Sequence, residues 1–372
     1  MAGGEKNGAV LETTLNKQGR ESASTTFASP GGVDEMYISP NQAIPIVFVP
    51  GIMGSPLIAT GNNTGIWAKQ GKWAWFPDGK FWMLGYGRLS YVQRRQLIDP
   101  DKVRALQNPE DADENVLTKF CKKSQMPLEE AKRRGWGSVM IESYGGILEY
   151  LENQLKFIFH RGNIYPGTQK ARPRDEKQWG DVNGYRRLSD DQLRKAAAWR
   201  FPVYAVGYNW VDTNTNAAAY LKVRVDQILN DCRKRLKLTC NQVILVTHSM
   251  GGLVARQYAK DHESEVLGIV HGVQPAIGAG TAYARVRGGW EANGWMAFKD
   301  GWIPELFPLS VVPSGWNALK AQIGAWALGK TAAEVMAVFS NGAGPLELLP
   351  NQLYGSNWLK VEYEEKGLFG NK

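Results

Sequence analysis

A buried strand followed at once by a serine, two glycines and a helical pattern is the feature that most constrains this chain. Ser249 stands at the centre of the stretch Val243-Ile-Leu-Val-Thr-His-Ser-Met-Gly-Gly-Leu-Val-Ala-Arg256. This order predicts a strand, a sharp turn and a helix, with the serine hydroxyl raised off the end of a sheet. The helix N-terminus then points at the serine, and the amide of Met250 is free to hold an oxyanion. The pattern favours a serine nucleophile at position 249.

Strand-like runs and amphipathic helical segments alternate along the chain. The strand-like runs are Ile44–Pro50, Phe201–Trp210, Gln242–Thr247 and Val266–His271, and the helical segments are Thr215–Leu236 and Met250–Lys260. Strands that alternate with helices over short connections form parallel pairs with crossover helices. The expected fold class is therefore α/β, with a mainly parallel sheet.

Two long segments interrupt this alternation, and we interpret them as additions to one α/β domain over 33–372. Residues 55–200 are expected to form an insertion, with a helix from Ser143 to about Phe159, and residues 275–345 are expected to form a cap region. Core packing is the simplest role for each tryptophan, and a lipid-facing cap is the alternative for the group. The tryptophans concerned are Trp67, Trp73, Trp75, Trp82, Trp136, Trp290, Trp295, Trp302, Trp316 and Trp326.

Composition adds bounds on location and partners. Residues 1–32 are polar, lack an apolar signal-peptide core and predict a disordered tail, so we expect a cytoplasmic protein. No apolar run approaches the roughly 18 residues that span a bilayer. The net charge of +8 is scattered, which favours solvated helix faces over binding of acidic phospholipid headgroups, and no nucleic-acid module is present.

The three cysteines lack the spacing of metal ligands. Buried reduced thiols are favoured for Cys121, Cys232 and Cys240, and a Cys232–Cys240 bridge is the alternative. We locate no acidic oxygen cluster for Ca²⁺. The sequence therefore predicts no metal and no cofactor.

A serine nucleophile needs a second oxyanion donor, a base and a group that orients the base. The loop Pro50-Gly51-Ile-Met-Gly54 follows the first strand, where Gly51 allows close backbone approach and Ile52 would present its amide. An ordinary strand-ending turn is the alternative for this loop taken alone. Ile52 and Met250 are thus the expected oxyanion donors.

The residues that flank the serine depart from the usual G-x-S-x-G pattern. Thr247 replaces the first glycine, where strand and helix meet closely, so we expect strain or displacement there. His248 precedes the serine directly and is expected to point away from it as a packing residue.

The base and the acid are the missing parts. Their usual order after the serine is acid and then histidine, and only His262 and His271 follow Ser249. His262 lies in a charged, solvated cluster, whereas His271 ends a strand at the correct sheet edge and is expected to line the pocket. Neither these nor His160 is assigned as the base. Because no histidine follows the later acidic residues (Glu347, Glu362, Glu364 and Glu365), we expect a C-terminally incomplete domain.

Four segments together resemble lecithin–cholesterol acyltransferase-type and inositol-deacylase-like lipases of the α/β-hydrolase superfamily. They are Val49-Pro-Gly-Ile-Met-Gly-Ser55, Tyr208-Asn-Trp210, Thr247-His-Ser-Met-Gly-Gly-Leu-Val-Ala-Arg256 and Leu348-Leu-Pro350. The resemblance implies Ser249 as nucleophile, with Ile52 and Met250 as oxyanion donors. It departs from the family in Gly207-Tyr-Asn-Trp-Val211, which lacks the family's Asp and Arg.

A further resemblance, over Val266–Arg287, is to bacterial lipases that include exported antibacterial phospholipase effectors. It implies export by a contact-dependent secretion system. The leading hypothesis is a serine esterase or phospholipase-like lipase that forms an acyl-enzyme on lipid esters, with transient contact to a membrane surface. The alternatives are an inactive or truncated hydrolase relic, a lipid-binding module, an acyltransferase and a protein-interaction domain.

Overall fold

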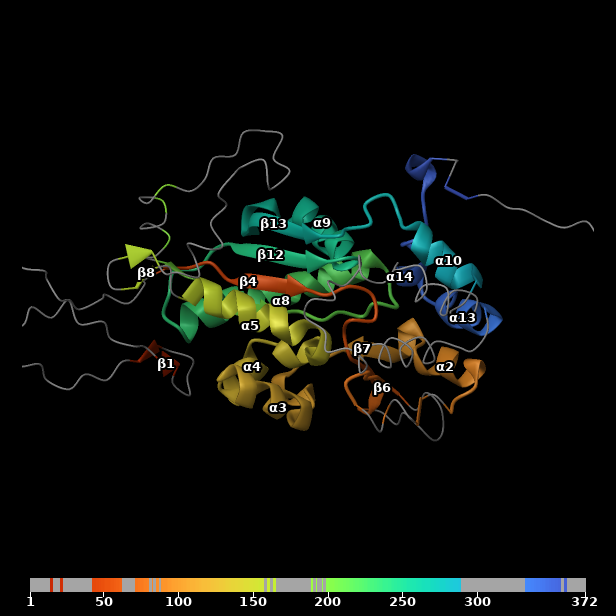
Figure 1. The fold of residues 1–372 in the computed structure, drawn as a ribbon, viewed down its shortest axis with the longest axis horizontal. Coiled ribbons are helices and arrows are strands. Elements are labelled where there is room, and N and C mark those ends of the chain that lie inside the picture. Colours follow the sequence, from red (N-terminus) through yellow and green to blue (C-terminus); the bar gives the residue numbers. More distant parts are fainter. Residues whose placement is uncertain are drawn as a thin grey trace, which may run out of the picture.

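The computed structural model describes residues 42–61, 71–79, 88–156, 199–288 and 332–355, with short pieces outside these ranges (Figure 1). These pieces include two strand pairs, β1 (Thr14–Leu15) with β2 (Glu21–Ser22) and β8 (Phe159–His160) with β9 (Asn163–Ile164). Most of the expected tail 1–32, the cap segment 289–331 with its five tryptophans, and residues 360–372 lie outside the described residues.

A four-stranded parallel sheet forms the centre of the fold. Its order is β11 (Val203–Ala205), β4 (Ile46–Val49), β12 (Val243–His248) and β13 (Val266–Gly272). The parallel pair β3 (Gln42–Ala43) and β10 (Trp199–Arg200) adjoins β4 and β11 in sequence. The α/β class and the parallel sheet expected from the sequence are confirmed.

The second strand is shorter than the sequence predicts. Within the expected run Phe201–Trp210, the hydrogen bonds of the sheet extend only as far as Val206. The Val206 amide donates to the Phe48 carbonyl at 2.9 Å. The next two amides donate instead to serine hydroxyls, Gly207 to Ser138 at 2.9 Å and Tyr208 to Ser55 at 3.0 Å. These side-chain acceptors draw the backbone out of the sheet and end the strand.

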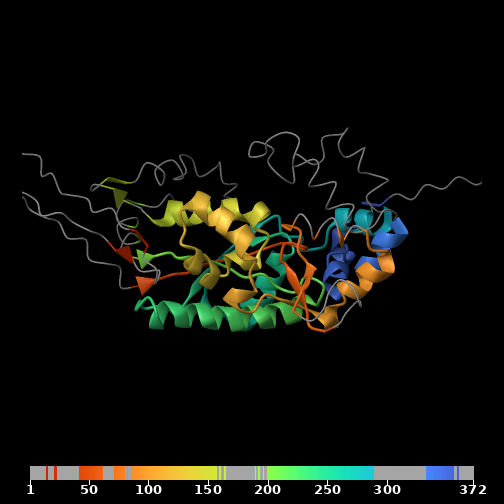
Figure 2. The same cartoon turned by 90° about the horizontal axis from the view of Figure 1, so that it is seen from below.

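Helices cover both faces of the sheet (Figure 2). Crossovers between parallel strands are right-handed, so connections that step the same way across a sheet lie on one face. Accordingly α8 (Asn214–Lys234) and α9 (Gly251–Asp261) pack together on one face, because both lead toward β13. The connection from β4 to β11 steps the other way, and its helix α5 (Ile141–Lys156) lies on the opposite face.

Side-chain alternation along the strands divides the core into two layers. In β12, Val243, Leu245 and Thr247 are buried on the face that α8 and α9 cover. Ile244 and Val246 face the other way, toward the layer of α5, α3 (Glu114–Ser124) and α4 (Leu128–Arg133). Since successive strand residues point to opposite faces, His248 belongs to the α5 side.

The segment between β4 and β11 contains elements that the sequence did not predict. A three-stranded antiparallel sheet has the order β6 (Trp73–Trp75), β5 (Leu57–Ala59), β7 (Val103–Ala105), and α2 (Tyr91–Leu97) begins with a capping box at Ser90. The predicted helix Ser143–Phe159 is confirmed as α5 with shifted ends. The remaining short elements here are η1 (Pro100–Lys102), η2 (Pro109–Asp111) and η3 (Trp136–Ser138).

Helices from both irregular segments meet at one end of the molecule. There α13 (Ala332–Phe339) packs between α2 and α10 (Gly280–Gly288), and α14 (Ala343–Leu346) follows it (Figure 1). The remaining turns are η5 (Glu263–Glu265) and η7 (Gln352–Tyr354). Trp75 and Trp136 are fully buried, which confirms core packing for these two, and Trp210 is fully buried as well.

The described residues also bear on the cysteines and on membrane-spanning helices. All three cysteines are buried and unbridged, as predicted. Within the described part of the chain, no helix has the length and apolar character that crossing a membrane requires.

A buried charge network joins the sheet to the helices on its α5 side. The Arg134 guanidinium donates to Glu130 at 2.6 Å and to Glu152 at 2.7 Å, and Arg235 of the segment after α8 donates to Glu130 at 2.9 Å. Burial alone would raise the pKa of Glu130, but Arg134 and Arg235 hold that pKa below its ordinary value. Glu152 also accepts the Val203 amide of β11 at 3.0 Å, so the network ties strand and helices together.

Replacing Arg134 with Met should lower the free energy of unfolding by about 3–5 kcal/mol, because it strands carboxylates inside the protein. Urea unfolding followed by tryptophan fluorescence measures the loss. Lys102→Met removes a half-exposed pair with Asp99 and should cost much less. Equal losses from the two variants would contradict a stabilising role for the network.

Candidate active site

The candidate site lies where the direction of the connections reverses. From β4 the chain steps to β11 on one side, and from β11 it returns past β4 to β12. The loops after β4 and β12 therefore leave adjacent strand ends in opposite directions, and ligands bind open α/β sheets at such a point. Ser249 follows β12 here, and the loop Pro50–Gly54 follows β4.

Ser249 occupies a strained turn between β12 and α9. Its φ of 50° lies in the left-handed region, which non-glycine residues rarely adopt. Its amide donates to the Gly272 carbonyl of β13 at 2.8 Å, and its carbonyl accepts the Gly252 amide at 2.9 Å. The predicted strand–turn–helix is present, and α9 begins two residues after the serine.

Two glycines let this turn lie directly against the loop after β4. A Cβ at Gly251 would stand 2.4 Å from the Pro50 carbonyl oxygen, and a Cβ at Gly51 would stand 3.1 Å from the Ser249 Cβ. Distances this short leave no room for a side chain at either position. The backbones of the two loops are consequently in contact beside the serine.

The loop after β4 is a tight turn that several other elements hold. The Gly54 amide donates to the Gly51 carbonyl at 3.0 Å, and Met53 has a left-handed φ of 60°. The Trp75 indole donates to the Met53 carbonyl at 2.8 Å. The Met140 amide, just before α5, donates to the Gly54 carbonyl at 2.9 Å. The segment between β4 and β11 thus fixes this loop from two sides.

The Tyr-Asn-Trp segment holds the far end of the same loop. Ser55 accepts the Tyr208 amide on its hydroxyl at 3.0 Å and the Trp210 indole on its carbonyl at 3.2 Å. Asn209 turns away and donates to the carbonyls of Pro100 and Val103 at 3.3 and 3.2 Å. The aromatic residues of this segment therefore support the loop.

Two amides near the serine make no backbone hydrogen bond within the described residues. The backbone hydrogen bonds of the described residues in this region use neither the Ile52 amide nor the Met250 amide. Ile52 lies within the loop after β4, and Met250 directly follows Ser249 at the start of α9. The sequence analysis expects these two residues to be the oxyanion donors, and that role stays a prediction.

His248 is bound from α5, by a residue that the sequence analysis missed. The Tyr144 hydroxyl lies 3.1 Å from the His248 Nδ1, and it accepts the Gly51 amide at 3.3 Å. Burial lowers the pKa of His248 and raises the pKa of Tyr144 to about 12. The helical spacing of Ile141, Tyr144 and Leu148 on α5 is the signal that would have placed Tyr144 on the buried face.

Thr247 and His271 meet on the opposite face of the sheet. The Thr247 hydroxyl lies 3.0 Å from the His271 Nδ1, and a Cβ at Gly252 would stand 3.0 Å from that nitrogen. Burial and the Arg256 charge lower the pKa of His271. Thr247 keeps its register with Val49, so the backbone strain expected there lies at Ser249 instead.

The other candidates lie apart from this cluster. His262 is the C-cap of α9, and its ring is tilted against that of Tyr258 with the centroids 5.1 Å apart. Glu347 accepts the Asn214 amide at the start of α8 at 2.8 Å. His160 is in β8, and the acidic residues at 362, 364 and 365 lie outside the described residues.

The Leu348-Leu-Pro350 segment borders the site from the cap side. The Ala279 amide donates to the Leu348 carbonyl at 2.8 Å, and the Asn351 amide donates to the Ile277 carbonyl at 3.1 Å. A Cβ at Gly344 would stand 2.8 Å from the Met250 side chain, so α14, which precedes this segment, packs close to the residue after the serine.

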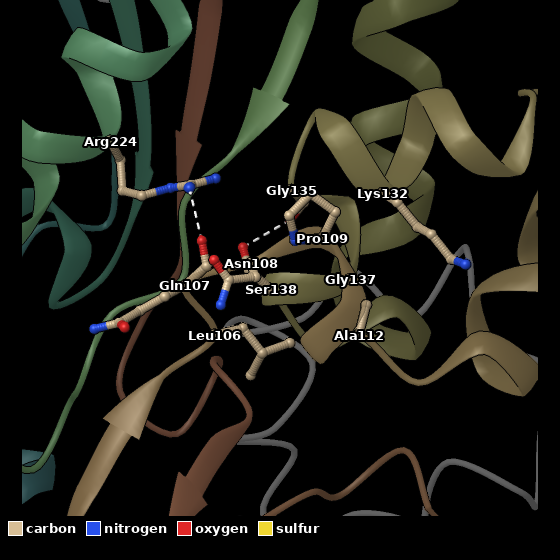
Figure 3. Close-up of a pocket in the computed structure, with 10 residues that line it drawn as sticks. All are labelled: Leu106, Gln107, Asn108, Pro109, Ala112, Lys132, Gly135, Gly137, Ser138 and Arg224. Carbon is tan, nitrogen blue, oxygen red and sulfur yellow. Dashed lines mark hydrogen bonds between the residues drawn. The ribbon is translucent and has the colours of Figure 1, made fainter. Parts of the chain in front are cut away.

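A separate hollow lies between the loop after β7, the turn from α4 to η3 and the middle of α8 (Figure 3). Arg224 donates to the Gln107 carbonyl across it at 3.1 Å, and Lys132 at its rim pairs with Glu114 and Glu129. None of the residues around Ser249 lines it. We therefore assign it no part in the candidate site.

The fold and the site together define a class. A parallel sheet with a strained serine between a strand and a helix, beside a glycine loop at the switch point, is consistent with the α/β-hydrolase type. No protein-family model and no curated protein matches the sequence.

Among solved structures, the chain is similar to Tle4 in the crystal structure of the Tle4–Tli4 complex. The TM-score is 0.64 and the identity is 27%, over 83% of this chain and 54% of that chain. This chain thus spans about half the length of that protein. The likeness supports, at a coarse level, the resemblance to phospholipase effectors of the α/β-hydrolase type.

The strain at Ser249 predicts a stability effect. Ser249→Gly should be more stable than Ser249→Ala by about 1 kcal/mol, because glycine adopts a left-handed φ without a Cβ penalty. Thermal unfolding of the two variants measures the difference. Equal stability, or a more stable alanine variant, would contradict the strained turn.

Proposed function

We propose that this protein is a serine hydrolase that cleaves acyl esters of lipids, with Ser249 as nucleophile and the amides of Ile52 and Met250 as oxyanion donors. The observation that carries the proposal is the left-handed Ser249 between a buried strand and a helix, in contact with a glycine loop. Strained backbone of this kind costs free energy and persists mainly at functional sites.

The chemistry follows from the geometry of the turn. Attack of the Ser249 hydroxyl on an ester carbonyl would place negative charge on the carbonyl oxygen. Amides fixed before reaction stabilise that charge without reorganising, which is the largest single contribution in many acyl-transfer enzymes. Collapse of that intermediate breaks the ester C–O bond and releases the alcohol, which takes up the serine proton, while the acyl group stays on Ser249. Water then cleaves the acyl-enzyme and releases the carboxylic acid, and an alcohol in place of water would make the same site an acyltransferase.

A lipid substrate is supported by exposed apolar side chains beside the site. Val273 follows Gly272, whose carbonyl holds the Ser249 amide, and 65% of its surface is exposed. Ile277, Leu346 and Leu353 are also exposed, on two segments that the bond from Asn351 to Ile277 joins. Such a surface suits transient contact with acyl chains at a membrane, although a single apolar residue would carry little meaning.

The base and the acid have no assignment in this proposal. The Nδ1 of His248 is engaged by Tyr144, and that of His271 lies beside Thr247. We propose His271, exposed at the end of β13, as a residue that lines the pocket. The alternative function is that of a relic or lipid-binding module, which would use the same pocket without turnover.

Export by a contact-dependent secretion system is proposed on the similarity to Tle4. That protein was crystallised in a complex with Tli4. We propose by analogy that this chain also has a protein partner.

Ser249→Ala should abolish hydrolysis of a short-chain nitrophenyl ester and labelling by a fluorophosphonate, since both require the serine hydroxyl. Release of nitrophenol and the mass of the labelled protein are the measurements. Ser264→Ala, a change of an exposed serine, is the control and should match the parent. Equal turnover and labelling in parent and Ser249→Ala would remove Ser249 as the nucleophile, and no turnover in either would favour the relic.

Ile52→Pro should lower kcat by about a hundredfold, the usual effect of losing one oxyanion donor. Ile52 is the second residue of a four-residue turn, a position that proline favours, so the change removes the amide and spares the fold. Steady-state kinetics and the thermal midpoint are compared with those of the parent. An unchanged kcat would remove Ile52 from the oxyanion site.

A further inference from the structure

The hydroxyl of Tyr144 contacts two residues that adjoin the nucleophile. It accepts the Gly51 amide at 3.3 Å and lies 3.1 Å from the His248 Nδ1. A Cβ on Gly51 would stand 2.9 Å from that nitrogen and 3.1 Å from the Ser249 Cβ. The three groups therefore meet at one point beside the serine, although they come from α5, the loop after β4 and the end of β12.

The direction of each hydrogen bond follows from the atoms involved. A phenol oxygen has one proton and two lone pairs, and the Gly51 amide can only donate. The Tyr144 proton is then directed at the His248 Nδ1, which must be the unprotonated nitrogen of a neutral imidazole. Burial lowers the pKa of His248 and raises the pKa of Tyr144 to about 12, so both groups hold these protonation states at neutral pH.

The bond from the Gly51 amide to the Tyr144 hydroxyl restricts the backbone of Gly51, and glycine has the least restricted backbone of any residue type. Its carbonyl is held by the Gly54 amide at 3.0 Å, and its amide is held by Tyr144. Those two bonds fix the peptide planes on either side of the Gly51 Cα. The second plane also carries the Ile52 amide, so the direction of that amide depends on both bonds.

The aromatic ring of Tyr144 has a separable packing role. A Cβ at Gly54 would stand 2.8 Å from the ring, and the Phe48 ring centroid lies 5.1 Å from that of Tyr144. The start of α5 is anchored independently, by the Met140 amide on Gly54 and by the Asp78 carboxylate on the Ile141 amide at 2.7 Å. Removing the hydroxyl alone thus leaves ring packing and helix anchors in place.

We infer that Tyr144 is a positioning residue that aims the Ile52 amide at the oxyanion, with His248 orienting its hydroxyl. The inference rests on the proposed function of Ser249 and deepens it. Tyr144 touches neither substrate nor nucleophile in this assignment and acts through Gly51. His248 acts one step further away, as the acceptor of the Tyr144 proton.

Tyr144→Phe tests the inference on the full chain with a short-chain nitrophenyl ester. We expect kcat to fall roughly tenfold with KM within about twofold, because the amide matters only when charge develops on the carbonyl oxygen. Tyr150→Phe is the matched control, since Tyr150 is exposed on the same helix, and its kinetics should equal those of the parent. His248→Asn, which keeps an acceptor, should retain more activity than His248→Leu.

A second measurement separates this inference from the proposed function. Amide hydrogen exchange by NMR should be faster at Gly51, whose amide loses its acceptor, in Tyr144→Phe than in the parent, whether or not the parent turns over ester. A parent without serine-dependent turnover would therefore contradict the proposed function, whereas exchange at Gly51 would still test the bond from its amide to Tyr144. Unchanged exchange at Gly51, an unchanged kcat in an active protein, or a kcat loss matched by a rise in KM would overturn the inference.

Discussion

The rest of the candidate site depends on one close approach between two backbones. The turn at Ser249 can stand against the loop after β4 only because Gly51 and Gly251 lack side chains, with hypothetical Cβ atoms 2.4 to 3.1 Å from neighbouring atoms. The left-handed φ of Ser249 is the conformational cost of that arrangement. Because both loops leave adjacent parallel strands at the switch point, the sheet order brings them together before any side chain contributes.

The segment between β4 and β11 supports this approach from the side. Trp75 binds the Met53 carbonyl, the Met140 amide binds Gly54, and Tyr144 binds the Gly51 amide. These contacts come from β6 and from the start of α5, and Ser55 adds the tie to Tyr208 and Trp210. The segment between β4 and β11 thus holds a glycine-rich turn that would otherwise have several conformations.

The sequence predicted the elements that follow from local periodicity. The strand Val243–His248, the helix after it and the parallel order were accessible because apolar alternation and crossover rules are short-range information. The contacts of Tyr144 with Gly51 and His248 could not be predicted from the sequence, because 93 and 104 residues separate Tyr144 from these two partners. The predicted length of the second strand was wrong for a similar reason, since the last amides of the predicted run donate to hydroxyls of serines that are distant in sequence. Alternation along β12 nevertheless indicates which face His248 occupies.

Thr247 shows why the usual glycine pattern is only one solution to this packing problem. A small residue is needed where strand, turn and helix meet, and here the helix supplies it. Gly251 lies against the Pro50 carbonyl, and Gly252 lies against His271. Because these two helix residues have no side chain, Thr247 is accommodated in β12 with ordinary strand pairing. The Thr247 hydroxyl meets the His271 Nδ1, which satisfies a polar group that is otherwise buried. Residues 247, 251 and 252 therefore share the steric demand at the turn, and among residues 247–252 only Ser249 has a left-handed φ.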